Sequence, residues 1–356
     1  MTEARARADL KRAKTVVVKV GSRTLANSPA FYARMGVEIA ALHARGLRVV
    51  LVSSGAIALG IKKLGYRSRP REMPKLQAAA AAGQSLLMRA WEEGFAAAGV
   101  KVAQVLLTHA DLSDRARANN ARDALKALLD AGCVPILNEN DSVAVDEIKF
   151  GDNDQLASLV APLVDADLLV LLSDVDGLLD ADGLRVGIVR DIEREAKPLI
   201  REAKSNEGTG GMHTKVEAAR RTSRYGASTA LANAGAEGVL AQLLAGEDVG
   251  TVFVPAARRM GAKQHWIAFT LRPTGDVVLD AGCAEAVRAG KSVLAVGVLG
   301  VRGAFEAGDA VRLLGPDGAE LGRALAKCGA GELARAAFAR SGDVVVHRSD
   351  AVIWQA

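Results

Sequence analysis

The chain has 356 residues, of which half are hydrophobic and 24% are charged, a balance typical of a folded globular protein rather than a disordered one. This length exceeds what one ordinary hydrophobic core holds, so we expect two domains. The formal net charge of +5 permits anionic ligands but does not indicate a nucleic-acid-binding protein.

Membrane and secretory signals are missing from the sequence, and so are cysteine spacings typical of metal or redox sites. No apolar run reaches the roughly 18 residues that a membrane helix needs, and the charged N-terminal segment lacks the apolar stretch of a secretory signal. Cys133, Cys283 and Cys328 lie far apart and match no C-x-x-C spacing. We therefore expect a cytoplasmic protein without a membrane partner.

Up to about residue 250, strand-like and helix-like segments alternate. Long segments rich in Ala, Leu, Arg and Glu, such as 75–98 and 112–130, have helical character. The strand-like runs are apolar nearly throughout, which is typical of strands buried on both faces of a parallel sheet. This alternation predicts an α/β three-layer sandwich with a mainly parallel central sheet. The expected strands are 15–20, 48–53, 101–107, 133–137 and 167–172.

After VPAARRMGAK (254–263) short strand-like pieces follow one another, separated by Gly and Asp turn signals. This pattern predicts a small β-rich barrel or sandwich. We place a first domain at 1–258, a second at 265–356, and the linker at about 254–264. The expected strands of the second domain are WIAFTL (266–271), DVVLD, SVLAVGVLG, DAVRLLG, DVVVH and AVIW.

Two of the expected strands end in small polar residues. The first carries Lys19 among valines and runs into Gly21 and Ser22, a setting in which backbone N–H groups can surround an anion. Lys19 either extends to solvent or reaches a phosphate, and the spacing alone does not decide. The second strand ends at Ser53, Ser54 and Gly55; an N-cap by either serine is slightly favoured over a ligand contact.

Residues 138–154, NENDSVAVDEIKFGDND, concentrate six carboxylates and three asparagines. The run could be a metal site, because Asp152 and Asp154 lie two residues apart, or a solvated loop. The calcium loop of an EF-hand is excluded, since its residue spacing is not matched. Asp152 or Asn153 could also cap the apolar helix that follows.

A third polar strand exit and a glycine-rich loop complete the candidates. Ser173 and Asp174 follow the strand 167–172. The loop that ends at Lys215 matches neither a Walker A loop nor a dinucleotide-binding fingerprint, but its backbone N–H groups, hydroxyls and cation suit phosphate oxygens. We favour this function over a flexible surface loop. The loop comprises Thr209, Gly210, Gly211, Met212, His213, Thr214 and Lys215.

These features together indicate phosphoryl transfer. Lys19 and Lys215, with Mg²⁺, could neutralise the charge of a triphosphate during in-line displacement. Asp154 is a candidate for the acid that holds the two lysines. A carboxylate acceptor needs no strong general base, which agrees with the lack of a Ser-His-Asp or Cys-His set.

Several motifs of the chain resemble those of the glutamate 5-kinase family in the amino-acid kinase superfamily. They cover most of residues 15–260 in the expected order, and the C-terminal part resembles a PUA domain. The main motifs are VVKVGS (17–22), VSSGAIALG (52–60), LQAAAAAGQ (76–84), QVLLTHADLSDR (104–115), NNARDAL (119–125), VPILNENDSVAVDEIKFGDND (134–154), ADLLVLLSDVDGL (166–178) and GTGGMHTK (208–215).

The resemblance implies phosphorylation of the γ-carboxylate of L-glutamate by ATP, the first step of proline biosynthesis, with Mg²⁺ carried mainly by the nucleotide and no metal site in the protein. It further implies proline as a feedback inhibitor and a dimer or tetramer.

The resemblance also assigns roles to the candidate residues. Lys19 and Lys215 would stabilise the transferring phosphoryl group, and Asp154 would organise them. The residues that match the glutamate-binding positions or lie beside them are Ser54, Gly55, Asp141, Asp152 and Asn153. Those that match the nucleotide site are Lys19, Gly21, Ser22, Ser173, Asp174 and the loop Thr209–Lys215.

Two alternatives stay open at this point. N-acetylglutamate kinase is the nearest, but a carboxylate such as Asp141 aimed at a free ammonium group would reject an acylated amine. PUA domains elsewhere bind RNA, whereas the near balance of basic and acidic residues in 262–356 gives no strong electrostatic footprint for a phosphate backbone. We therefore do not expect a nucleic-acid partner.

Overall fold

The computed structural model describes residues 2–26, 29–143, 153–202, 211–257 and 259–354. The chain divides into two compact units, Met1–Arg259 and Met260–Ala356. None of the described helices is long and apolar enough to cross a membrane.

The N-terminal unit is built on an eight-stranded sheet in the order β3-β4-β2-β1-β5-β7-β8-β6. Its neighbouring strands run parallel except for the pair β7 and β8. The five strands expected from the sequence are all present. The strands are β1 (Thr15–Val20), β2 (Arg48–Ser53), β3 (Lys101–Leu107), β4 (Cys133–Glu139), β5 (Leu168–Ser173), β6 (Ile188–Val189), β7 (Ser228–Asn233) and β8 (Thr251–Phe253).

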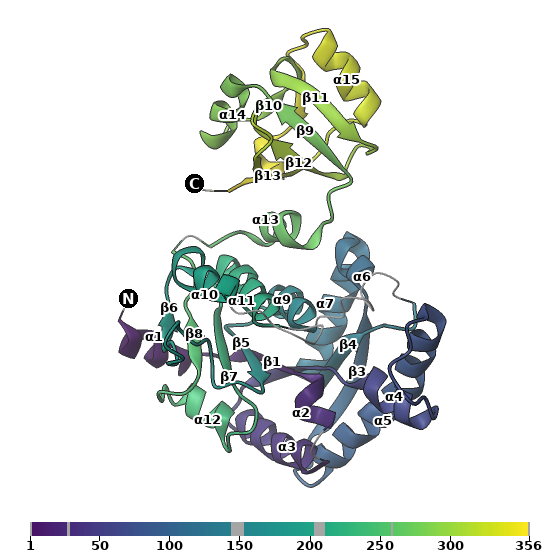
Figure 1. Cartoon of the computed structure of the whole chain (residues 1–356), viewed down its shortest axis with the longest axis vertical. Coiled ribbons are helices and arrows are strands. Elements are labelled where there is room, and N and C mark those ends of the chain that lie inside the picture. Colours follow the sequence, from purple (N-terminus) through teal and green to yellow (C-terminus); the bar gives the residue numbers. More distant parts are fainter. Residues whose placement is uncertain (1, 27–28, 144–152, 203–210, 258, 355–356) are drawn as a thin grey trace. The chain divides into compact units, whose positions relative to one another are not determined.

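Helices cover both faces of this sheet, as Figure 1 shows, and give the predicted three layers. One layer contains α7, α9 and α11, and the other contains α3, α5 and α12. The helices among the described residues of the unit are α1 (Glu3–Leu10), α2 (Ser22–Ala26), α3 (Pro29–Ala44), α4 (Ala56–Lys63), α5 (Met73–Ala96), α6 (His109–Ser113), α7 (Arg115–Asp130), α9 (Asn153–Leu163), η1 (Ile192–Ala196), α10 (Lys197–Glu202), α11 (Met212–Tyr225) and α12 (Val239–Leu244).

Strand β1 sends alternate side chains to the two helical layers, because successive residues of a strand point to opposite faces. Val16, Val18 and Val20 belong to the hydrophobic core that includes residues of α3, α5 and α12. Lys19 therefore points to the layer of α9 and α11. Lys19 is buried like every other residue of β1, but it faces the helical layer opposite to the one that Val18 and Val20 contact.

The helix expected at 112–130 begins later than predicted. Asp114 has extended backbone angles (φ −80°, ψ 123°) and its carboxylate accepts a hydrogen bond from the Arg117 N–H, so it caps α7 at Arg115. The preceding short helix α6 starts at a capping box formed by Thr108 and Asp111.

Helices α4 and α5 pack with their backbones in contact. A Cβ atom on Gly60 would lie 1.7 Å from the carbonyl oxygen of Ala79, and one on Gly83 would lie 1.8 Å from that of Ala56. Only glycine allows this approach. The packing fixes α5 against the first turn of α4, which follows the exit of β2.

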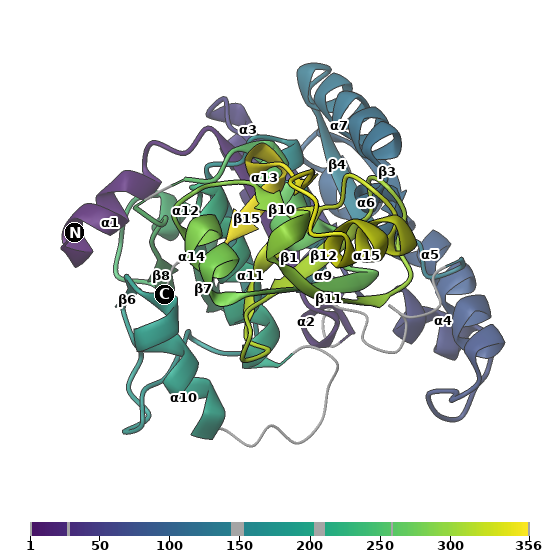
Figure 2. The ribbon, with the colours of Figure 1, turned by 90° about the horizontal axis from the view of Figure 1, so that it is seen from above.

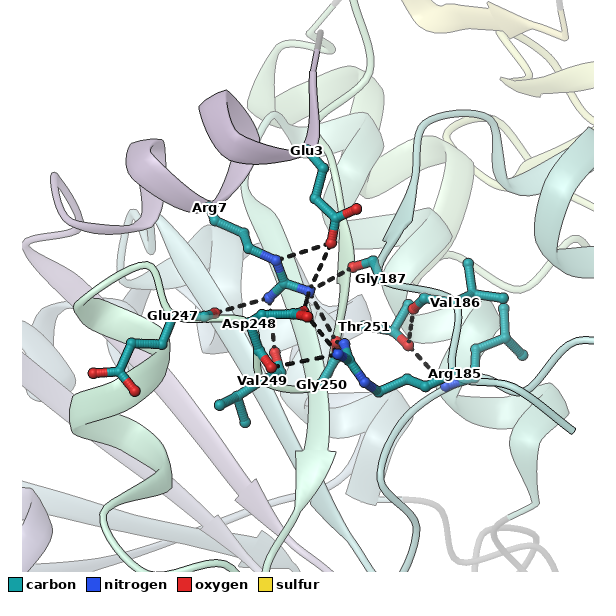
Figure 3. A network of polar contacts seen from close by, with 11 residues as sticks. Glu3, Arg7, Arg185, Val186, Gly187, Glu247, Asp248, Val249, Gly250 and Thr251 are labelled. Atoms are coloured by element: carbon teal, nitrogen blue, oxygen red, sulfur yellow. Dashed lines mark hydrogen bonds and ion pairs between the residues drawn. The ribbon is translucent and has the colours of Figure 1, made fainter.

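Helix α1 is fastened to the β6–β8 edge of the sheet by Arg7, which is only 4% exposed (Figure 3). Its Nη2 atom lies 2.7 Å from Oδ1 of Asp248, and its Nε atom donates to Glu3. Arg185 contacts the same Asp248 oxygen at 2.7 Å. The guanidinium group of Arg7 also donates to the carbonyl oxygens of Gly187, Glu247, Val249 and Gly250.

The C-terminal unit is β-rich, as expected, with a five-stranded sheet in the order β11-β9-β12-β13-β15 and the pair β10-β14. Its strands are β9 (Gly275–Leu279), β10 (Val293–Leu294), β11 (Val298–Gly303), β12 (Ala310–Leu314), β13 (Glu320–Leu325), β14 (Val344–Val346) and β15 (Ala351–Ile353). Its helical elements are α13 (Ala262–His265), η2 (Trp266–Thr270), α14 (Ala281–Arg288), η3 (Ala295–Gly297), α15 (Ala330–Phe338) and η4 (Arg348–Asp350).

The strand predicted at 266–271 is wrong, because this segment forms the π-helical turn η2. Ile267, Ala268 and Phe269 are all buried, so the segment lacks the alternation of a half-buried strand. His265 and Phe269, four residues apart, place their ring centroids 4.8 Å from each other, which is the neighbour spacing of a helix.

Candidate active site

The expected polar strand exits meet at one edge of the sheet. Strands β1, β2, β4 and β5 are mutually parallel, so their carboxyl ends share an edge, where open α/β sheets bind ligands. In Figure 2 the N-terminal unit is seen from the direction at right angles to that of Figure 1, with α9 and α11 near its centre.

At this edge two lysines from distant parts of the sequence contact one carboxylate. The Nζ atom of Lys19 on β1 lies 2.6 Å from Oδ1 of Asp154 on α9. The Nζ atom of Lys215 on α11 lies 3.1 Å from Oδ2 of the same residue. Lys19 is 5% exposed, Lys215 6% and Asp154 0%. Lys19 thus does not extend into solvent.

Burial alone would raise the pKa of Asp154, since a low-dielectric surrounding disfavours the charged form. The two ammonium groups outweigh this effect and lower the pKa to about 2. Asp154 is therefore ionised throughout the neutral range. One negative charge lies between two positive ones, which leaves a net positive charge for an anionic ligand at this edge.

Helix α11 brings a further contact to Asp154. The hydroxyl of Thr214 donates to Oδ2 of Asp154 at 3.0 Å and lies 2.9 Å from the carbonyl oxygen of Gly211. Gly211, Met212 and His213 occupy the start of the same helix. The first turn of α11 is thus joined directly to the Asp154 cluster.

The exit of β2 differs from the serine N-cap favoured in the sequence. Gly55 itself occupies the N-cap position of α4, with φ 103°, and no side chain caps this helix. A left-handed backbone of this kind strains any residue with a Cβ atom. Ser54 instead accepts a hydrogen bond from Nδ2 of Asn153 at 2.7 Å.

Asn153 is the first residue of α9, and its side chain does not cap the helix as proposed from the sequence. Its Nδ2 atom donates to Ser54 and, at 3.0 Å, to Oδ1 of Asn138. Its Oδ1 atom is buried and has no hydrogen-bond partner among the described residues. The carboxamide thus joins the exits of β2 and β4.

Asn138 and Gln84 belong to this cluster and were not identified from the sequence. Asn138 is 2% exposed, and its Nδ2 atom donates to Oε1 of Gln84 on α5 at 2.9 Å. The available signal was a polar residue at the end of an apolar strand, in CVPILN (133–138). Nothing in the sequence indicates that Gln84 faces it.

The remaining predicted residues lie along the same edge of the sheet. Gly21 follows β1, and a Cβ atom on it would lie 3.7 Å from Nζ of Lys19; Ser22 begins α2. Ser173, which is buried, ends β5, and its hydroxyl donates to the exposed Asp174 at 3.0 Å. Asp141 is half-buried in the turn after β4.

Three of the predicted site residues, Asp152, Thr209 and Gly210, lie outside the described residues. In the whole part of the chain that the structure describes, no group of three or more His, Cys, Asp or Glu side chains could hold a metal ion.

Comparison with known proteins identifies the family of the chain. The amino acid kinase family matches residues 14–233, and the PUA domain matches residues 275–347. Glutamate 5-kinase of Geobacter metallireducens is 44% identical over 97% of this chain and 98% of its own length. Glutamate 5-kinase of Myxococcus xanthus is 46% identical over 98% of both. The chain belongs to the glutamate 5-kinase family.

Membership of the glutamate 5-kinase family makes the chain a phosphotransferase and confirms the resemblance found in its motifs. Among solved structures, carbamate kinase from Giardia lamblia bound to AMP-PNP has a TM-score of 0.51 and 17% identity, covering 69% of this chain and 99% of that one. N-acetylglutamate synthase from Neisseria gonorrhoeae has a TM-score of 0.53 and 19% identity, covering 72% and 63%. At these identities both support the amino-acid kinase fold alone.

Proposed function

We propose that the protein transfers the γ-phosphoryl group of ATP to the γ-carboxylate of L-glutamate, giving ADP and L-glutamyl 5-phosphate. This is the first step of proline biosynthesis. The observation that carries the proposal is the pair of buried lysines, Lys19 and Lys215, on the carboxylate of Asp154 at the carboxyl edge of the sheet.

The lysine pair suits the charge that develops in phosphoryl transfer. Negative charge spreads over the oxygens of the transferring group, and preorganised cations in a dry site stabilise it without reorganisation. Lys19 and Lys215 would supply these cations, and Asp154 would hold them at a fixed separation. The glutamate carboxylate is already a nucleophile, so no residue has to remove a proton from it.

Binding of the amino acid falls to the exits of β2 and β4 in this proposal. Asp141 would pair with the ammonium group of glutamate, and Ser54 and Asn153 would orient it, with Gly55 allowing close backbone approach. Asp152 lies in the same stretch. Acylation removes the ammonium charge, so N-acetylglutamate could not form the ion pair with Asp141 and would bind poorly.

ATP would lie between β1, β5 and α11. Gly21 and Ser22 would offer backbone donors to its phosphates, Ser173 and Asp174 would contact the nucleotide, and the loop Thr209–Lys215 would enclose it. Mg²⁺ carried by ATP would add positive charge at the phosphate oxygens. The residues fit an anion of this kind, because the Asp154 cluster has one negative and two positive side chains.

The proposal includes a cytoplasmic location, where ATP and free glutamate are available, and a homo-oligomer, dimer or tetramer. It also includes proline as a feedback inhibitor.

Trapping the acyl phosphate with hydroxylamine tests the activity directly. Purified protein with ATP, Mg²⁺ and L-glutamate should give the γ-hydroxamate, with one ADP for each hydroxamate. N-acetylglutamate in place of glutamate should give little product. Hydroxamate formation with N-acetylglutamate but not with glutamate would refute the substrate assignment and leave a related amino-acid kinase.

A further inference from the structure

A chain of carboxamides runs from α5 to the proposed amino-acid site, and its hydrogen bonds can be assigned without ambiguity. Oδ1 of Asn138 lies 2.9 Å from the backbone N–H of Glu139. A backbone N–H can only donate, so this Asn138 atom must be the oxygen and the other must be the nitrogen. The nitrogen of Asn138 therefore faces Gln84, 2.9 Å away.

The same reasoning fixes both neighbours of Asn138. The Gln84 atom that meets the Asn138 nitrogen must be its oxygen, because two NH₂ groups cannot bond to each other. The Asn153 atom that meets Oδ1 of Asn138 at 3.0 Å must be its nitrogen. This Asn153 nitrogen also lies 3.4 Å from the carbonyl oxygen of Ser53, a pure acceptor, which agrees with the assignment.

One consequence is that Asn153 presents its oxygen on the side away from Asn138. This oxygen is buried and has no hydrogen-bond partner among the described residues, a state that costs free energy unless a ligand supplies a donor. The ammonium group of an amino acid is such a donor. Asn138 fixes the orientation in which the Asn153 carboxamide offers its oxygen to such an ammonium group. The nitrogen of Asn138 bonds in turn to Gln84.

Gln84 is held in place by the contact between two helices. It follows Gly83, whose position leaves no room for a Cβ atom beside the carbonyl oxygen of Ala56. Ala56 is the first residue of α4 and follows Ser54 and Gly55. The backbone at Gln84 is thus held close to the turn that we assign to the amino acid, and the Gln84 carboxamide bonds to Asn138.

We propose that Gln84 is a positioning residue for the amino-acid substrate, acting through Asn138 on the carboxamide of Asn153. This inference rests on the proposed function, because it takes Asn153 as part of the glutamate site. Gln84 itself touches neither substrate in this proposal. Its effect should therefore appear in the binding of glutamate and not in the binding of ATP.

The first test compares Gln84→Leu with Gln84→Glu in the hydroxamate assay on the full chain. Leucine removes the acceptor, and we expect the KM for glutamate to rise about tenfold, with kcat and the KM for ATP within about twofold. The Gln84→Glu variant keeps an acceptor oxygen in its side chain, so we expect its KM for the substrate glutamate to lie within about threefold of the wild-type value. Gln242→Leu, which removes a half-buried carboxamide on α12, is the matched control and should leave all three constants unchanged.

A second test stays informative if Gln84→Leu does not fold. In Asn138→Asp, one oxygen still accepts from Glu139 and Asn153, and Gln84 can turn its NH₂ group to the other. Each single variant, Gln84→Glu or Asn138→Asp, should therefore bind glutamate within about threefold of wild type. The double variant places two carboxylates in contact and should raise the KM more than tenfold.

Additive effects in the double variant would overturn the proposal. An unchanged KM for glutamate in Gln84→Leu would also overturn it. A fall in kcat together with rises of similar size in the KM values for glutamate and ATP would show that Gln84 has only a structural role. A wild-type protein that forms no hydroxamate from glutamate would instead refute the proposed function, and the two failures are therefore distinguishable.

Discussion

Lys19 and Lys215 contact different oxygens of one buried carboxylate, Asp154, from a strand and from a helix. Because each lysine has its own oxygen, the two ammonium groups are held apart although both are nearly inaccessible to solvent. Such a pair would be strongly destabilising without the acid, since two like charges would then be buried together. The cluster of two lysines and one aspartate therefore has a net positive charge, which can attract an anionic ligand.

Substitution of Lys215 by methionine tests this use of charge. Met keeps the length and apolar stem of the side chain but removes the cation, so we expect kcat to fall by about 10²–10³. The KM for glutamate should change by less than about threefold, because Lys215 is not proposed to bind the amino acid. Steady-state hydroxamate kinetics measure both.

Lys215→Arg is the matched variant, which retains the charge but not the point-like shape of an ammonium group. It should recover part of the lost kcat. An equal loss of turnover and of glutamate affinity in Lys215→Met would identify the lysine as structural.

Replacement of Asp154 by asparagine should show a distinctive pH dependence. The folded pKa of about 2 lies below the ordinary value of 3.8, so the ionised carboxylate stabilises the fold above about pH 4. This contribution, about 2 kcal/mol, is lost as the pH falls towards 2. Asp154→Asn should therefore be less stable than wild type at pH 7, and the difference should narrow below pH 4.

Urea unfolding of both proteins at pH 7, 4 and 2.5 measures this difference. Asp123→Asn provides the control, because the Asp123 side chain is 68% exposed, and its substitution should change the free energy of unfolding by less than about 0.5 kcal/mol. A difference between wild type and Asp154→Asn that is as large at pH 2.5 as at pH 7 would contradict the assigned pKa.

The sequence predicted the sheet well where its strands are continuous β-branched or aliphatic runs, as in Thr15–Val20. It did not predict β7 (Ser228–Asn233), whose small and polar residues give a weak strand signal. It was wrong for 266–271, because a short apolar run does not distinguish a strand from a buried helical turn. Whether such a segment forms a strand or a helical turn depends on its tertiary contacts.

The candidate site was predicted in its residue types but not in its contacts. From the position of Lys19 near the end of a buried strand, contact with solvent and contact with a phosphate were equally good predictions. Its side chain contacts Asp154 because it faces the helical layer that contains α9. The pairing of Asn138 with Gln84 depends on a contact between β4 and α5, elements that the sequence does not place side by side. Residue-by-residue patterns contain no information of that kind.

The close packing of α4 on α5 predicts that Gly83→Ala is strongly destabilising. The added Cβ atom would lie 1.8 Å from the carbonyl oxygen of Ala56, so the helices would have to separate. We expect a loss of about 3 kcal/mol in the free energy of unfolding of the N-terminal unit, together with a higher KM for glutamate because Gln84 moves.

Gly331→Ala is the control for that substitution. Gly331 also lies in a helix, α15, but the new Cβ atom would lie 3.8 Å from Nη1 of the Arg335 side chain, which is an ordinary contact distance. Alanine is the better helix former, so this change should be neutral or stabilise the C-terminal unit by up to about 1 kcal/mol. Chemical denaturation followed by circular dichroism compares the two. Equal stability of Gly83→Ala and wild type would show that the helices can separate freely.

The attachment of α1 to the sheet edge predicts a loss of stability in Arg7→Lys, although the charge is retained. The guanidinium group of Arg7 donates to four carbonyl oxygens and also contacts Glu3 and Asp248. A lysine has three donors in another geometry, so several of these mostly half-buried carbonyl groups would lose the hydrogen bond that Arg7 donates. We expect the free energy of unfolding to fall by about 2–4 kcal/mol, with kcat and both KM values unchanged at 25 °C.

Arg12→Lys on the neighbouring surface is the matched control. The Arg12 side chain is 85% exposed and lies 3.5 Å from Asp9, and exposed ion pairs of this kind contribute little. Its substitution should change the free energy of unfolding by less than about 0.5 kcal/mol. Thermal and urea unfolding of the three proteins measure these differences. An Arg7→Lys variant as stable as Arg12→Lys would mean that water replaces the lost donors, and that α1 is not fastened by this residue.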